Sequence, residues 1–395
     1  MKLQVVAGLL SVASLAAAGP LTISQITSST GGCGDCYFHN PSLSANGSIA
    51  FYYDGDLTGG NAGHNPEIFR FNAARNTITQ ITRGLCATAC GFFLSSRANG
   101  SIAFSATYDG NFEVFRFDAA TNTITQITHS SGLCSNGLPV MSSTNGSIAF
   151  ASSCDLTGGN PDGNVEIFYF DAGTATIKQI TNSTSCRSFP SSSIADGSIA
   201  FASECDLTGG NPDGNFEVFR FDIATNTITQ ITDSTGFCLL DEPASLSASG
   251  TSIGFESSCD LTGGNPDGNS QIFRYDAVTN TISQITHSTF EPGTSRCYGS
   301  FSPSVNANGS IAFESSCGLT GGNPDGNDEI FLFDSATKRL TQITNSARSS
   351  GSCFANSSPS LNALGRIAFE SDCNLTGGNP DGNREIFLAT PRHRR

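Results

Sequence analysis

One short sequence unit recurs seven times along this chain, and that repetition constrains the fold more than any other feature. The triplet Gln-Ile-Thr begins at seven positions that are 46 to 58 residues apart, namely Gln25, Gln80, Gln126, Gln179, Gln230, Gln284 and Gln342. Two other segments return between the triplets in a fixed order, one close to Gly-Ser-Ile-Ala-Phe and one close to Glu-Ile-Phe-Arg-Phe. A repeat of about 50 residues is typical of architectures in which each unit is one supersecondary element packed against its neighbours.

Each segment of the repeat has the composition of a β-strand. Short β-branched and aromatic runs are bounded by Gly, Asn, Asp or Pro, and no window has the period of a helix. A Pro- and Ser-rich segment, residues 41–45 in the first copy, supplies one more strand ahead of the other three. Asn46-Gly47 and its counterparts predict a two-residue hairpin turn between the first two strands. Four antiparallel strands in about 50 residues predict the blade of a propeller.

The two ends of the chain predict how the ring closes. The last copy ends after Glu385–Leu388 without a Gln-Ile-Thr strand, whereas Leu21–Thr27 is an isolated copy of that strand. The N-terminal strand should therefore complete the last blade, because an open ring would leave unpaired edges exposed. We predict an all-β, seven-bladed β-propeller of four-stranded antiparallel blades, formed as one domain by residues 19–390 and followed by a short basic tail, 391–395.

The N-terminus and the overall charge limit the compartment and the partners. Lys2, an apolar run over residues 5–16 and the small residues Ala16-Ala17-Ala18 have the layout of a secretory signal peptide, which we place at residues 1–18. No other stretch is long and apolar enough for a membrane helix. The net charge of −15 argues against nucleic acid or an anionic membrane as partner. We therefore expect a secreted or periplasmic protein.

The cysteines follow the repeat in five of the seven units. One Cys precedes the first strand and another follows the second strand, 19 to 21 residues later: Cys134 and Cys154, Cys186 and Cys205, Cys238 and Cys259, Cys297 and Cys317, Cys353 and Cys373. Antiparallel neighbours bring these positions together, so we predict five disulfides. The remaining four are Cys33, Cys36, Cys86 and Cys90. We expect them to form two short loops or a cross-blade pair, although Cys-x-x-Cys also occurs in redox and zinc sites.

A second repeated motif, Cys-Asp-Leu-Thr-Gly-Gly-Asn-Pro-Asp-Gly-Asn-x-Glu, connects the second and third strands. Oxygen-bearing side chains alternate along it at Asn160, Asp162, Asn164 and Glu166, which is a pattern that Ca2+ prefers. The other copies would contribute Asp213, Asp267, Asp325 and Asp381. The alternative is a structural type I turn, with Pro and Gly of Asn-Pro-Asp-Gly in their favoured positions. We expect no required cofactor, with Ca2+ as an option.

Residues repeated in every unit serve the fold, so a binding site is expected where the repeat is broken. The breaks place aromatic and polar residues in connections of one face: Tyr37, His39, Tyr52, Tyr53, His64, Phe92, Phe290, Arg296 and Tyr298. Exposed aromatics with a few polar groups suit a sugar or a peptide. Irregular packing at the seam of the ring explains the same residues.

The repeat Ser-x-Asn-Gly-Ser-Ile-Ala-Phe, Glu-Ile-Phe-Arg-Phe-Asp, Gln-Ile-Thr resembles the TolB-like (WD40-like) propeller repeat over residues 21–388. The resemblance implies a disc-shaped scaffold for protein contacts in bacterial envelopes, or a cap on a catalytic domain. We expect a non-enzymatic module that binds a protein or a glycan on one loop face, and we assign no catalytic residue. One alternative is a polysaccharide lyase or hydrolase using residues such as His39, His64 and Arg296; another is a calcium-stabilised structural propeller.

Overall fold

The computed structural model describes residues 21–29, 38–85, 90–108, 110–195, 197–236, 238, 244–289, 297–348 and 353–392, with the backbone alone at 38–39, 90–93 and 191–193. The signal peptide predicted at residues 1–18 lies outside this part of the chain. The described residues form 28 β-strands and no helix. Consequently, no described helix could cross a membrane.

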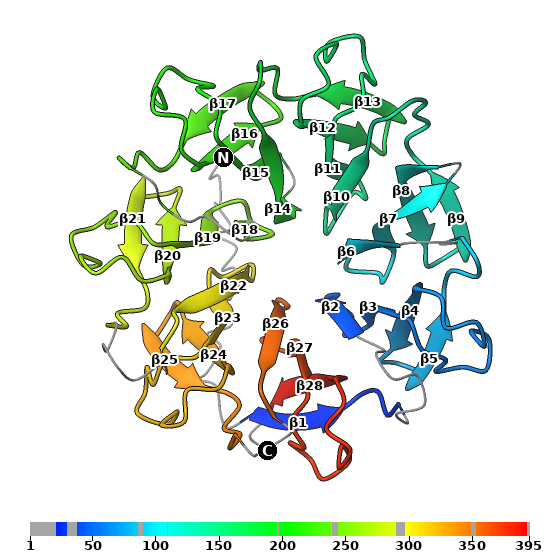
Figure 1. Ribbon diagram of the computed structural model, residues 1–395, viewed down its shortest axis with the longest axis vertical. Helices are drawn as coiled ribbons and strands as arrows, with labels where there is room; N and C mark the ends of the chain where they lie inside the picture. The colour runs from blue at the N-terminus through cyan, green and yellow to red at the C-terminus, as the bar shows by residue number, and fades with distance from the viewer. Residues whose placement is uncertain are drawn as a thin grey trace, which may run out of the picture.

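The strands form seven four-stranded antiparallel sheets arranged as blades around a ring (Figure 1). Blades 1 and 2 contain β2 (Phe38–Leu43), β3 (Ile49–Tyr53), β4 (Glu67–Asn72) and β5 (Thr77–Gln80), then β6 (Cys90–Ser96), β7 (Ile102–Tyr108), β8 (Asn111–Asp118) and β9 (Thr123–Gln126). Blades 3 and 4 contain β10 (Asn136–Met141), β11 (Ile148–Ser152), β12 (Glu166–Asp171) and β13 (Thr176–Gln179), then β14 (Ser188–Ala195), β15 (Ser198–Ser203), β16 (Glu217–Asp222) and β17 (Thr227–Gln230).

Blades 5 and 6 contain β18 (Ser245–Leu246), β19 (Ser252–Ser257), β20 (Gln271–Asp276) and β21 (Thr281–Gln284), then β22 (Ser300–Val305), β23 (Ile311–Ser315), β24 (Glu329–Asp334) and β25 (Arg339–Gln342). Blade 7 contains β26 (Asn356–Leu361), β27 (Ile367–Ser371), β28 (Glu385–Pro391) and β1 (Leu21–Gln25). The predicted seven-bladed all-β propeller is confirmed.

The N-terminal strand closes the ring as the sequence predicted. β1 pairs antiparallel with β28 along its whole length, from Leu21 opposite Pro391 to Gln25 opposite Phe387. The backbone N–H of Ile26 continues the ladder by donating to the carbonyl of Ile386 at 2.8 Å. In Figure 1 the dark-blue β1 lies beside the red β28, so the two ends of the domain share one blade.

Apolar side chains fill the interfaces between blades. The structure contains seven hydrophobic clusters, and each combines residues of two neighbouring blades. One of them joins Ala368 and Ile386 of blade 7 to Phe51 and Phe69 of blade 1. Seven interfaces for seven blades mean that no blade leaves a large apolar face in water.

A stacked phenylalanine pair recurs in every blade. Phe150 of β11 lies opposite Phe168 of β12, and the equivalent pairs of all seven blades have ring centroids 5.5–6.0 Å apart. Burying one such side chain stabilises the fold by about 1.5–3 kcal/mol. The repeated Phe positions are therefore packing positions, as predicted. The outermost strands alternate exposed and half-buried residues, as in β13 and β17.

The first turn of the blade differs from the predicted two-residue hairpin. In blade 1, β2 ends at Leu43, and the N–H of Gly47 donates to the carbonyl of Ser44 at 3.0 Å. Gly47 has a φ of +86°, whereas Asn46 does not have a positive φ. A turn followed by a glycine in the left-handed region makes a longer loop with a bulge. The Asn46 side chain holds this loop by accepting a hydrogen bond from the N–H of Ser48 at 2.8 Å.

Ring closure generates a prediction about β1. Ile23 packs against the blade 7 core, whereas the neighbouring Ser24 is exposed. We expect Ile23→Asp to lower the free energy of unfolding by about 2 kcal/mol, because it places a charge against apolar side chains. Ser24→Asp is the matched control and should change it by less than about 0.5 kcal/mol. Denaturant unfolding measures both, and an equal loss for the two variants would contradict the role of β1 in closure.

Candidate functional site

The two faces of the disc are built differently. We call the face that carries the connections between second and third strands, and between one blade and the next, the loop face. The turn face carries the short turns between first and second and between third and fourth strands. The five predicted disulfides are confirmed, with Cα–Cα distances of 4.2 to 5.5 Å. Each ties a connection between blades to the end of a second strand, so all five lie on the loop face.

The other four cysteines fall on residues or side chains that the structure does not describe. Cys33, Cys36 and Cys86 lie outside the described residues, and the Cys90 side chain is not described. One group of potential metal ligands, Cys353, Asp372 and Cys373, does occur in the described part of the chain. Its two cysteines are bonded to each other, and Asp372 Oδ1 accepts the N–H groups of Phe354 and Ala355. This group is therefore a disulfide with a structural carboxylate.

A buried glutamate lies at the start of the third strand in six of the seven blades, as its first residue in five of them and its third in blade 2: Glu67, Glu113, Glu166, Glu217, Glu329 and Glu385. In all six, a backbone N–H two residues beyond the Gln-Ile-Thr triplet donates to the carboxylate at 2.6–2.7 Å. In blade 3, Glu166 also accepts hydrogen bonds from the Thr181 and Ser183 hydroxyls and the Asn164 side chain. Glu166, predicted as a calcium ligand, therefore has donors on both carboxylate oxygens.

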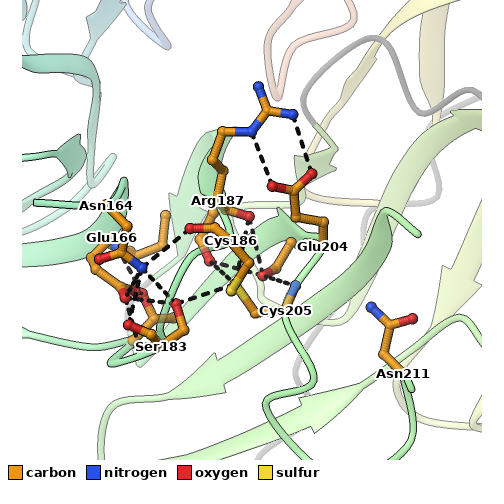
Figure 2. The surroundings of a disulfide bond; sticks show 12 residues. Asn164, Glu166, Ser183, Cys186, Arg187, Glu204, Cys205 and Asn211 are labelled. Atoms are coloured by element: carbon orange, nitrogen blue, oxygen red, sulfur yellow. Dashed lines mark hydrogen bonds and ion pairs between the residues drawn. A yellow bond between two sulfur atoms is a disulfide. The ribbon is translucent and has the colours of Figure 1, made fainter. Parts of the chain in front are cut away.

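Figure 2 shows how this carboxylate is linked to a disulfide. Asn164 Nδ2 donates both to Glu166 Oε1, at 2.9 Å, and to the carbonyl of Cys186, at 3.2 Å. Cys186 is bonded to Cys205 of blade 4, and Ser183 Oγ lies 3.2 Å from Cys205 Sγ. Blade 3 is thus held to the second strand of blade 4 by both covalent and hydrogen-bonded contacts.

The long connections between second and third strands divide their polar residues between two environments. Asn160 is 2% exposed, and its Nδ2 donates to the carbonyl of Asn164 at 3.0 Å. Asp162 is exposed at the tip of the loop, and so are its counterparts Asp213, Asp267 and Asp381. Asp325 is half-buried and accepts the N–H of Arg348. The structure therefore brings Asn160, Asn164 and Glu166 together and leaves Asp162 outside this group.

The predicted ligand-binding residues are dispersed. Tyr37, Phe290 and Arg296 lie outside the described residues, and the side chains of His39 and Phe92 are not described. Tyr298 is 65% exposed on the loop face and His64 is exposed there as well. Tyr52 and Tyr53, however, are 6% and 2% exposed.

The expectation that Tyr52 and Tyr53 form an exposed binding surface is wrong. They are consecutive residues of β3, whose two faces both pack against neighbouring blades. Tyr52 packs towards blade 2 and Tyr53 towards blade 7. Burial raises the pKa of Tyr52 to about 12, with Asp54 and Glu67 adding to the effect.

Exposed apolar residues extend the surface predicted at Tyr298 to three residues that were not predicted. Tyr108, Leu133, Tyr298 and Phe354 are 44%, 109%, 65% and 49% exposed, and all four lie on the loop face. Only two described residues of this kind, Val278 and Leu364, lie in turns of the opposite face. The loop face therefore carries most of the exposed large apolar side chains.

A sequence signal for this surface exists. Arg187, Tyr298 and Phe354 occupy one repeat position, directly after the first cysteine of a disulfide. The residue at that position changes from blade to blade while its flanking cysteine does not. Arg187 is paired with Glu204 at 3.0 Å and lies over the rings of Phe189 and Phe216 at 6.0 and 5.8 Å.

A cavity of about 320 Å³ lies at the centre of the ring. The first strands of the blades line it with Ser, Pro, Ala, Asn and aliphatic residues, and none of the described residues that line it is ionisable. Serine hydroxyls join neighbouring first strands by accepting backbone hydrogen bonds. The N–H of Leu43 donates to Ser360 Oγ at 2.9 Å. The N–H of Leu361 donates to Ser304 Oγ, also at 2.9 Å. The described part of the lining therefore supplies no acid, base or anionic metal ligand.

Buried acids gather in blades 6 and 7, next to the seam. Burial raises the pKa of Glu370, which is 1% exposed. Glu370 accepts the N–H of Asn40 in blade 1 at 2.8 Å and pairs with Arg384 at 3.2 Å. Burial also raises the pKa of Asp328, and the Asp372 carboxylate adds to the effect. These contacts join blade 7 to blade 1 and bring no nucleophile or base to a cleft.

Comparisons with known proteins support the fold. No protein-family model matches this sequence, and no curated protein is significantly similar to it. An oligogalacturonate lyase from Vibrio parahaemolyticus aligns with a TM-score of 0.60 at 12% identity, covering 95% of this chain and 98% of that one. An oligogalacturonate lyase in complex with manganese aligns with a TM-score of 0.58 at 13% identity, covering 95% and 97%.

The β-propeller domain of the Trilobed protease from Pyrococcus furiosus aligns with a TM-score of 0.57 at 9% identity, covering 91% of this chain and 95% of that one. At these identities the similarity shows a β-propeller and no particular activity. The resemblance to the TolB-like repeat is thus supported only to the level of the propeller fold. The five disulfides are typical of an extracellular or periplasmic protein.

The buried Glu370 generates a prediction about pH. Because its folded-state pKa is raised above the ordinary value of 4.5, the stability linked to its protonation is present below pH 4.5 and is lost as pH rises. We expect Glu370→Gln, which keeps an acceptor for Asn40, to reduce this loss, so that stability falls less steeply with rising pH than in the wild type. Urea unfolding between pH 4.5 and 8 measures it. Glu204→Gln, at the surface, is the control, and identical slopes in all three proteins would refute the prediction.

Proposed function

We propose that this protein is a secreted or periplasmic binding module without catalytic activity, and that its loop face holds a protein partner rich in basic groups. The observation that carries the proposal is the concentration of exposed apolar side chains beside the disulfides of that face. Solvent-exposed groups of this kind are typical of interaction surfaces.

The spacing of these side chains favours a protein over a small ligand. Tyr108 belongs to blade 2, Leu133 to the connection between blades 2 and 3, Tyr298 to that between blades 5 and 6, and Phe354 to that between blades 6 and 7. A partner that touches several of them must span much of the disc. The central cavity, which could hold a small ligand, has no charged side chain among the described residues of its lining.

The loop face is also held in place before binding. Tyr298 and Phe354 each follow a cysteine whose disulfide anchors the backbone to a second strand. A constrained backbone lowers the entropy lost on association, so each exposed side chain contributes more to affinity.

Charge favours a basic partner. The connections between second and third strands carry eight exposed aspartates: Asp56, Asp155, Asp162, Asp206, Asp213, Asp260, Asp267 and Asp381. A surface with one dominant sign of charge attracts the opposite sign and accelerates association at low salt.

The arrangement of ionisable groups supports a non-enzymatic role. The described histidines His64, His129 and His287 are exposed on three different blades. The buried carboxylates of the loop face are bonded to backbone and hydroxyl donors, as Glu166 is. A hydrolase or lyase needs an acid and a base within reach of one substrate.

The proposal predicts a loss of affinity confined to loop-face variants. Partners would be isolated from the extracellular or periplasmic fraction, purified, and titrated against the wild-type protein by surface plasmon resonance. We expect the triple variant L133S/Y298S/F354S to bind about 30-fold or more weakly, which is the effect of losing one strong contact residue. The association rate should also fall when NaCl is raised.

The matched control is V278S/L364S, which removes two exposed apolar residues from the turn face. It should bind as the wild type does. A loss confined to the control variant would place the partner on the other face. Chemical conversion of the bound partner, followed by mass spectrometry, would show that the module is an enzyme.

A further inference from the structure

Four of the long loops contain asparagine side chains whose carbonyl oxygens are buried without a hydrogen-bond donor. The oxygens belong to Asn160 and Asn164 in blade 3, Asn211 and Asn215 in blade 4, Asn323 and Asn327 in blade 6, and Asn379 and Asn383 in blade 7. Asn160, Asn211, Asn323 and Asn379 are 2%, 2%, 6% and 1% exposed. A buried carbonyl without a donor is unfavourable, so something outside the protein should satisfy it.

Blade 5 provides an internal comparison. Its loop, Cys259–Asn269, has the same sequence as the loops of blades 3 and 4, but Gln271 replaces the buried glutamate. Gln271 Nε2 lies 3.5 Å from Asn265 Oδ1, and neither Asn265 nor Asn269 has a buried oxygen without a donor. Among the five loops that contain Asn-Pro-Asp-Gly-Asn, the asparagine oxygens are thus left without partners in the four that keep the carboxylate, and not in the one that has the amide. Blade 1 lacks this motif, and there Asn61 Oδ1 accepts the N–H of Asn65 at 3.2 Å.

The group missing from the other four loops should carry positive charge. Among the described residues, none of the six glutamates at the start of a third strand pairs with Lys, Arg or His. In blade 3, the Glu166 carboxylate is bonded only to neutral donors. A buried charge without a counter-ion is unfavourable, and the surrounding aspartates raise the local concentration of cations.

The chemistry of the oxygens favours calcium. Amide carbonyls and water are ordinary calcium ligands at 2.3–2.6 Å, whereas magnesium gives up its water reluctantly.

We propose that the loops of blades 3, 4, 6 and 7 each bind one calcium ion, with the two asparagine carbonyl oxygens as ligands, water completing the shell and the buried glutamate as counter-charge. Blade 5 does not bind calcium because Gln271 supplies a donor and no charge. With so little protein charge, each site should have a dissociation constant of about 0.1–1 mM, as in extracellular calcium modules. The inference is independent of the proposed partner.

The test exchanges the residues of blades 3 and 5. Glu166→Gln gives blade 3 the side chain that blade 5 already tolerates, and Gln271→Glu does the reverse. Equilibrium dialysis against CaCl2 in 150 mM NaCl should yield four calcium ions per wild-type chain, three for Glu166→Gln and five for Gln271→Glu. The difference between variants removes the contribution of exposed aspartates, which all three proteins share.

Thermal unfolding supplies a second readout. The quadruple variant E166Q/E217Q/E329Q/E385Q should lose the rise in Tm that calcium produces in the wild type. Equal stoichiometry in the wild type and Gln271→Glu would overturn the proposal and leave water as the partner of the buried oxygens. Equal binding of MgCl2 would overturn the choice of calcium. Glu217→Gln replaces Glu166→Gln if the latter fails to fold.

Discussion

The pairing of β1 with β28 is the contact on which the rest of the structure depends. A blade has two apolar faces, and only a closed ring covers both faces of every blade. Among the described strands, β1 and β28 are the only pair within a blade that lie far apart in the sequence. They place blade 7 against blade 1, where Phe51 and Phe69 complete the seventh interface.

The repeat explains how much could be predicted. Phe150 and Phe168, the paired cysteines and the closing strand all recur or complete a recurrence, so one copy corrects the interpretation of another. Tyr52 and Tyr53 break the repeat, and a break in the repeat predicts an exposed site. Their strand is buried on both faces, a property of the ring that a single strand pattern does not show. Phe354 was missed because its signal is the variation at one repeat position, visible only when the blades are aligned on their cysteines.

The buried glutamate shows why a repeated residue can be read in two ways. The Glu166 oxygens accept hydrogen bonds from the Thr181 hydroxyl and the Ser183 N–H, which follow the fourth strand of the blade. Glu166 therefore has a structural role, because it joins the third strand to the end of the fourth. Gln271 has the same structural role in blade 5, where the Thr286 hydroxyl donates a hydrogen bond to Gln271 Oε1 at 2.7 Å. This connection between the third and fourth strands therefore needs a hydrogen-bond acceptor but does not need a negative charge. Six copies nevertheless keep the charge in a buried place, which is unfavourable unless a cation compensates it. In four of these six blades the asparagine oxygens of the loop also lack a donor, and this combination is the physical reason to look for an ion there.

Calcium in these loops would act on the proposed binding surface in two opposing ways. The loops that hold Asn160 and Asn211 lie on the same face as Tyr298 and Phe354. Each bound ion would cancel two negative charges there and weaken the long-range attraction for a basic partner. It would also order a loop that otherwise depends on its own hydrogen bonds, lowering the entropy lost when a partner binds. The first effect is screened by salt and acts mainly on the association rate, whereas the second acts on dissociation and persists at high salt. The two can therefore be separated by ionic strength, and the sign of the calcium effect at high salt reports the contribution of loop order alone.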